Sequence, residues 1–152
     1  MQIWMDGDAC PKPIKDILFR AATRSMTLLQ VVSNHTLITP GSKFINRTQV
    51  SQGFDVADQY IVDHMQPGDL VITADIPLAD SVVTNSGYAL NPRGEFYTSN
   101  NIKQHLMQRN MNESLRGSGL LSGGPPKFSL KDLQRFANHL DQWITKQKRA
   151  GL

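Results

Sequence analysis

Apolar residues in the first ninety positions alternate between short continuous runs and stretches with helical spacing. Continuous runs such as LLQVVS and DLVIT are typical of strands that are buried on both faces of a sheet. The predicted strands are residues 2–5, 28–33, 47–52, 69–73 and 88–90, the third of them edge-like. The predicted helices between them are residues 11–26, 54–65 and 76–87. Strands that alternate with helices imply right-handed crossovers and a mainly parallel sheet of about five strands. We therefore expect an α/β fold, a three-layer, Rossmann-like sandwich.

Helix boundaries are marked by residues that suit the first turn. Pro11 and Pro13 are tolerated at the start of the first helix, where a missing N–H leaves no hydrogen bond unmade. Asp55 is predicted to cap the second helix and to place Asp58 at its N3 position. Asp75 or Ile76 is expected to cap the third.

The last third of the chain has a different pattern. Residues 98–116 and 129–149 predict two C-terminal helices, and the second has apolar residues at steps of three and four. Between them lies a Gly/Pro-rich segment, residues 117–127, which predicts a loop without regular structure. We interpret residues 1–152 as one domain, since this length is sufficient to bury a core.

Charge is unevenly distributed, although the net value is only +3. Residues 1–80 contain nine Asp and six Lys or Arg, whereas residues 81–152 contain four acidic and ten basic residues. The acidic part could hold cations and the basic part could contact phosphates. Solvated helix faces would explain the same distribution.

Cysteine content and hydropathy narrow the class of protein. The single cysteine, Cys10, excludes an internal disulfide and a Cys-rich zinc site. No apolar run approaches the roughly 20 residues of a membrane span, and the N-terminus lacks the layout of a signal peptide. We expect a cytoplasmic protein with no membrane contact. Its oligomeric state stays open.

Carboxylates follow two of the predicted buried strands. Asp6 and Asp8 come directly after the first strand, Asp75 follows the fourth, and Asp80 lies five residues further on. In a doubly wound sheet, ligands bind at the carboxyl ends of the strands where the strand order reverses. If the first and fourth strands are neighbours there, the four carboxylates share one crevice, and Asp58 approaches from the side.

Neighbouring carboxylates raise one another's pKa, and a divalent cation removes that conflict. Oxygen ligands favour Mg²⁺ or Mn²⁺, which can activate water and neutralise a phosphate oxygen. Thr73, Arg93 and Arg116 are candidate phosphate contacts. Each residue also has an ordinary explanation, because Asp and Gly favour turns and caps and arginines are common on surfaces.

Several sequence blocks resemble one family. IWMDGDACP, VITADIPLAD, LNPRG, NNI and SGGPPKF occur in this order along nearly the whole chain, and the chain resembles the YaiI/YqxD family of uncharacterised bacterial proteins. That family is grouped with the PIN-like superfamily, whose better-known members are metal-dependent nucleases. The resemblance implies a PIN-like fold and acidic site residues at Asp6, Asp75 and Asp80, with Thr73 before Asp75 and Asp58 in mid-chain.

Three functions are consistent with these patterns. The first is a Mg²⁺- or Mn²⁺-dependent nuclease in which Asp6, Asp8, Asp75 and Asp80 are catalytic and RNA or another nucleic acid is the substrate. The second is a phosphatase, because Asp6-x-Asp8 also resembles the first motif of haloacid-dehalogenase-type enzymes, with Asp6 as nucleophile. The third is a non-catalytic module that binds nucleic acid or protein.

Overall fold

One six-stranded sheet organises the chain. The computed structural model describes residues 1–53, 55–117 and 128–150, with side chains up to residue 111 in the helix that ends at 117. The strands are β1 (Ile3–Asp6), β2 (Leu29–Ser33), β3 (Ile45–Gln49), β4 (Leu70–Ile72), β5 (Tyr88–Leu90) and β6 (Phe96–Tyr97). The helices are α1 (Lys12–Ser25), α2 (Val56–His64), α3 (Ile76–Thr84), α4 (Ile102–Gly117) and α5 (Leu130–Ala150).

The strand order reverses at β1. The order across the sheet is β3-β2-β1-β4-β5-β6, so the chain moves outward from β1 in one direction and then returns to its other side at β4. β1 pairs in parallel with both β2 and β4, through Asp6 beside Val32 and Met5 beside Ile72. The first and fourth strands are therefore neighbours, which is the condition for a crevice shared by their carboxylates. The carboxyl ends of these strands form the ligand-binding edge of this topology.

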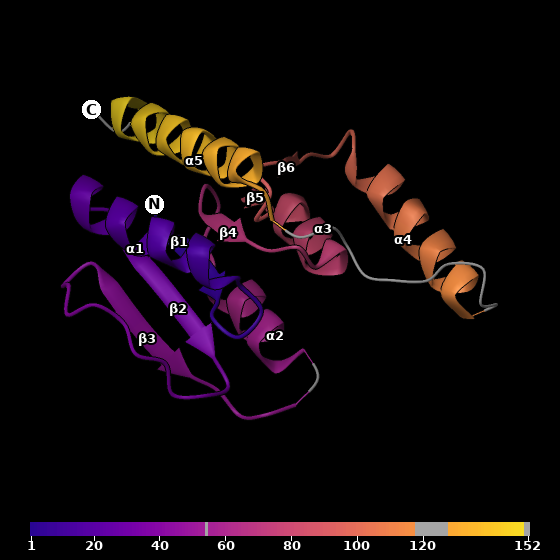
Figure 1. The fold of residues 1–152 in the computed structure, drawn as a ribbon, viewed down its shortest axis with the longest axis horizontal. Coiled ribbons are helices and arrows are strands. Elements are labelled where there is room, and N and C mark those ends of the chain that lie inside the picture. The colour runs from indigo at the N-terminus through magenta and orange to yellow at the C-terminus, as the bar shows by residue number, and fades with distance from the viewer. Residues whose placement is uncertain (54, 118–127, 151–152) are drawn as a thin grey trace.

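Helices cover both faces of the sheet and make the predicted three-layer sandwich (Figure 1). One face packs against α1 and α5, where the buried side chains of α5 are Phe136, Leu140, Trp143 and Ile144. The other face packs against α2, α3 and the start of α4. Strand residues alternate between the two cores: Ile3 and Met5 belong to the first, and Trp4 to the second. This alternation directs Asp6, two residues after Trp4, to the α2–α3 side.

Two details of the sheet differ from the predicted pattern. β3 begins at Ile45, two residues before the predicted start, because Ile45 is buried and pairs with Leu29. β6 was not predicted, since a two-residue strand has no periodicity to detect. It pairs antiparallel with β5 through Leu90 beside Phe96. Most of the predicted 117–127 loop lies outside the described residues. In the described part of the chain, no helix has the length and apolar composition needed to span a membrane.

Candidate functional site

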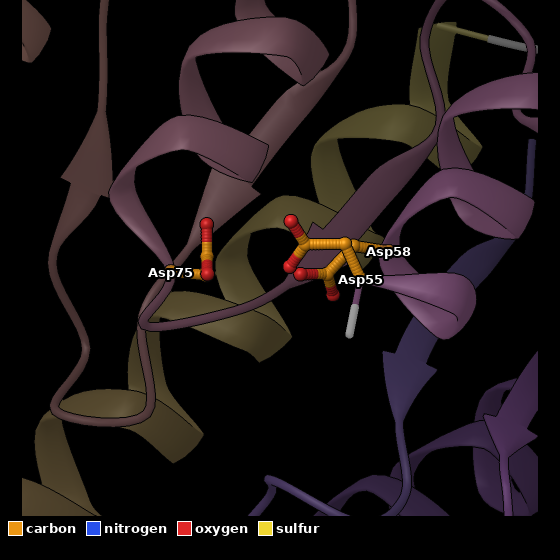
Figure 2. A group of neighbouring side chains, drawn as sticks. All are labelled: Asp55, Asp58 and Asp75. Atoms are coloured by element: carbon orange, nitrogen blue, oxygen red, sulfur yellow. The ribbon is translucent and has the colours of Figure 1, made fainter. Parts of the chain in front are cut away.

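Three carboxylates meet at the carboxyl edge of the sheet. Asp55 precedes α2, Asp58 lies in its first turn, and Asp75 precedes α3. One oxygen from each lies within 4.8 Å of the others. Figure 2 shows the Asp55 and Asp58 side chains facing Asp75 across the gap between the two helices. The cluster therefore joins two helix N-termini, whose dipoles favour negative charge.

Asp75 is fixed by the turn between β4 and α3. Its carboxylate accepts a hydrogen bond of 2.8 Å from the Leu78 backbone N–H, which makes Asp75 the predicted cap of α3. Its own backbone N–H donates to the hydroxyl oxygen of buried Thr73, at 2.9 Å. These two hydrogen bonds hold one carboxylate oxygen against the helix and fix the direction of the side chain. Position and orientation of Asp75 are therefore set by the fold itself.

Asp55 occupies the predicted cap position of α2, but its side chain does not make the capping hydrogen bond. Its backbone is left-handed, with φ of 62°. A capping residue needs an extended backbone to aim its oxygen at the N–H groups of the first turn. The left-handed turn instead directs the Asp55 carboxylate toward Asp58 and Asp75.

Asp6 faces an inner cavity of about 120 Å³ beside the cluster. The cavity is lined by Asp6, Ala9, Cys10, Asp58, Ile72, Thr73, Ala74, Asp75 and Pro92. Asp6 accepts hydrogen bonds from the backbone N–H groups of Asp8 and Ala9, at 3.0 and 3.3 Å. Burial raises the pKa of the Cys10 thiol to about 12, so Cys10 contributes a neutral wall and no thiolate.

Negative charge accumulates around Asp58. Burial raises the pKa of this carboxyl to about 6, and the charges of Asp75, Asp6 and Asp55 add to the effect. Burial also raises the pKa of Asp6, with smaller contributions from Asp8 and Asp75, while its two backbone hydrogen bonds oppose the rise. The site thus disfavours its own full ionisation, which is the condition that a bound cation relieves.

The Asp8 side chain is directed toward the loop that follows β2. Its carboxylate accepts a hydrogen bond of 2.6 Å from the Asn34 backbone N–H and lies 3.1 Å from Nδ1 of His35. It does not line the inner cavity that contains Asp6. The phosphatase hypothesis requires both carboxylates at one phosphate, so this arrangement does not favour it.

Asp80 also stands apart from the cluster. It lies within α3, five residues after Asp75, and belongs neither to the three-carboxylate group nor to the lining of the inner cavity. Five residues correspond to a rotation of about 140° around a helix axis, so the two side chains leave the helix in different directions. Asp75 and Asp80 are close in the sequence, but the helix geometry directs their side chains apart.

The three residues predicted to contact phosphate lie in different parts of the chain's structure or outside its described side chains. Thr73 lines the inner cavity. Arg93 binds Asp132 at the start of α5, with 2.8 Å between Nη1 and Oδ2, and stacks over Phe128 at 4.4 Å. It is thereby directed to the α5 side. The Arg116 side chain lies outside the described residues.

An outer cavity contains two site residues that the sequence reading did not assign. It has a volume of about 270 Å³, and its lining includes Asp55, Asp58 and Asp75 together with Arg109 of α4. Asp55 could have been found from its spacing, because residues three apart share a face near a helix start. No sequence pattern around Arg109 indicates a role in the site, because only the packing of α4 beside α3 brings this residue to the outer cavity.

Comparisons with known proteins agree on one family. The family model described as "Uncharacterized BCR, YaiI/YqxD family" matches residues 4–146. A UPF0178 protein of Shewanella baltica is 57% identical over 145 residues, which cover 95% of this chain and 97% of the relative. A UPF0178 protein of Janthinobacterium sp. is 54% identical over 151 residues, or 99% and 100% of the two chains. One from Legionella pneumophila is 55% identical over 148 residues, 97% and 100%. No solved structure matches the chain significantly.

Proposed function

The chain belongs to the YaiI/YqxD family, and we propose that it is a divalent-cation-dependent hydrolase of phosphodiesters, with RNA as the substrate to test first. The observation that carries the proposal is the convergence of Asp55, Asp58 and Asp75 oxygens within 4.8 Å at the reversal point of the sheet. The grouping of the YaiI/YqxD family with the PIN-like superfamily, whose better-known members are metal-dependent nucleases, supports the same chemistry.

The carboxylate spacing fits a hard cation. Two oxygens bound to one Mg²⁺ at about 2.1 Å lie at most about 4.2 Å apart, twice the bond length. The cluster oxygens lie within 4.8 Å of one another, so at most a small movement of the side chains brings them to this spacing. All donors are carboxylate oxygens, which favours Mg²⁺ or Mn²⁺ over zinc. Ca²⁺, with longer bonds, is the natural comparator in a binding experiment.

The residues divide into three roles. Asp55, Asp58 and Asp75 would hold the cation, and Asp6 adds negative charge from the inner cavity. A bound divalent cation supplies an activated water and neutralises charge on a phosphate oxygen. Thr73 accepts a hydrogen bond from the Asp75 N–H, so its hydroxyl proton can be donated to a phosphate oxygen at the cavity wall.

The test is a Mn²⁺ titration by calorimetry on the wild type, Asp58→Asn and Asp75→Asn, followed by cleavage of a short labelled RNA with Mn²⁺ or EDTA. Asparagine keeps the shape of aspartate and still caps helices, so Asp75→Asn should preserve the start of α3. We expect loss of Mn²⁺ binding and of cleavage in both variants.

Asp80→Asn is the matched control. It removes the same charge from the same helix as Asp75→Asn but lies outside the cluster. We expect near wild-type binding and cleavage. Absence of Mn²⁺ binding by the wild type, or equal losses in the Asp80 and Asp75 variants, contradicts the proposal.

A further inference from the structure

The outer cavity is lined by side chains of opposite charge. Asp55, Asp58 and Asp75 are its acidic residues, and Arg109 of α4 lines the same cavity. A volume of about 270 Å³ accommodates several molecules the size of water, at about 30 Å³ each. The cavity is therefore large enough for a small ligand group that contacts both kinds of side chain.

Arg109 comes from a separate part of the fold. α4 follows the sheet in sequence and packs alongside α3, the helix that Asp75 caps (Figure 1). Arg109 is partly exposed and lines the outer cavity. It belongs to the basic second half of the chain, whereas the carboxylates belong to the acidic first half. The fold thus joins the two charge regions at one cavity.

A ligand that contacts both the carboxylates and Arg109 presents positive charge to the former and negative charge to the latter. A divalent cation bound to a phosphate group has this character. The planar guanidinium donates two parallel hydrogen bonds to phosphate oxygens, which gives it both charge and geometry for this role. We infer that Arg109 is a phosphate-binding residue of the site, which binds the substrate phosphate in the outer cavity that it shares with the cation-holding carboxylates. This inference rests on the proposed function.

A simpler role for Arg109 is that of a counter-ion to the carboxylates. The two roles give different results when the side chain is removed. A phosphate-binding residue is needed for phosphate affinity when the cation is already bound. A counter-ion competes with the cation, so its removal strengthens cation binding and leaves phosphate affinity nearly unchanged.

The experiment measures two affinities by calorimetry, for Mn²⁺ alone and for adenosine 5′-monophosphate at saturating Mn²⁺. The variants are Arg109→Ala, Arg109→Lys and the control Lys103→Ala. Lys103 lies on the same helix and carries the same charge, is exposed, and does not line the outer cavity. Thermal melting of all four proteins establishes that each is folded, and Arg109→Lys retains the charge if the alanine variant is unstable.

We expect Arg109→Ala to weaken nucleotide affinity about tenfold or more, the scale of a charge-assisted hydrogen bond, without weakening Mn²⁺ binding. Arg109→Lys should lose part of the nucleotide affinity, because the lysine ammonium is a point charge and lacks the planar guanidinium that donates two parallel hydrogen bonds. Lys103→Ala should match the wild type. Nucleotide affinity of Arg109→Ala within about threefold of Lys103→Ala overturns the inference and leaves the proposed function standing. Failure of the wild type to bind Mn²⁺ overturns both.

Discussion

Asp58 and Asp132 occupy equivalent positions at the starts of two helices, yet their carboxyl groups shift in opposite directions. Each is the third residue of its helix, α2 or α5. Asp132 exchanges hydrogen bonds with Ser129 and pairs with Arg93, and these contacts lower its pKa. Burial and three neighbouring carboxylates raise the pKa of Asp58 to about 6. A helix N-terminus favours negative charge in both cases, so the surroundings decide the outcome.

The comparison contrasts a carboxylate in a structural capping box with a carboxylate of the proposed cation site. The start of α5 is a complete capping box, in which Ser129 and Asp132 satisfy each other's backbone N–H groups. The start of α2 has capping-type residues at the same two positions, Asp55 and Asp58, but the left-handed Asp55 leaves the box unformed. The carboxylates of Asp55 and Asp58 instead lie beside Asp75.

The largest expected effect is on cation binding. Asp58→Asn should weaken Mn²⁺ binding and cation-dependent RNA cleavage by about 100-fold or more, because loss of even an outer-shell partner of a metal costs about 10- to 100-fold. Asp132→Asn should change neither. Calorimetry and cleavage rates measure the two effects. If Asp132→Asn impairs cleavage as strongly as Asp58→Asn, the functional distinction between the two residues is lost.

The second effect is on stability and its dependence on pH, without divalent cations. Asp58 has its pKa raised from 3.8 to about 6 on folding, so the folded chain holds more protons than the unfolded chain between these values. Stability from this group is therefore complete below about pH 4 and is lost as the pH rises through 6. Because Asp58 is only half-buried, solvent screening reduces the loss to about 1 kcal/mol.

Urea unfolding in EDTA at pH 4 and pH 7 measures this difference. Asp58→Asn should equal the wild type at pH 4 and exceed its free energy of unfolding by about 1 kcal/mol at pH 7. Asp80→Asn serves as the control with no such gain. Saturating Mn²⁺ should reverse the order at pH 7, because ligand binding stabilises only the wild type. A pH-independent difference between Asp58→Asn and wild type would contradict the assignment.

Much of the architecture follows from local patterns in the sequence. The apolar runs identify β1 and β4, and their adjacency follows from the reversal of strand order in doubly wound sheets. That rule brings Asp6 and Asp75 to one edge, and both line the inner cavity. The two-residue β6 lacks such a pattern and is stabilised by its pairing with β5.

The remaining site residues depend on side-chain direction and long-range packing. Asp8 turns toward Asn34, which no spacing rule indicates, and Asp80 is rotated away from Asp75 by the helix. The role of Asp55 depends on a left-handed backbone that aspartate tolerates better than most residues. Arg109 reaches the outer cavity only because α4 packs on α3.

A third, smaller effect tests the two helix starts. Ser129→Ala should lower the free energy of unfolding by about 1 kcal/mol, since it removes the hydroxyl that accepts the Asp132 N–H. Asp55→Asn should cost nothing, because Asp55 makes no capping hydrogen bond and asparagine also tolerates a left-handed backbone. Chemical denaturation in EDTA measures both. Equal destabilisation by the two changes would show that α2 is capped after all.

The smallest effect is expected for Arg93, the arginine that the sequence suggested as a phosphate contact. Its side chain is 30% exposed and pairs with Asp132, so Arg93→Ala should destabilise the protein by less than about 1 kcal/mol. Nucleotide affinity at saturating Mn²⁺ should stay within about threefold of wild type, because Arg93 lines neither of the two cavities. A loss as large as that expected for Arg109→Ala would instead place the phosphate on the α5 side. Asp132 would then belong to the site, and the contrast between the two helix starts would fail.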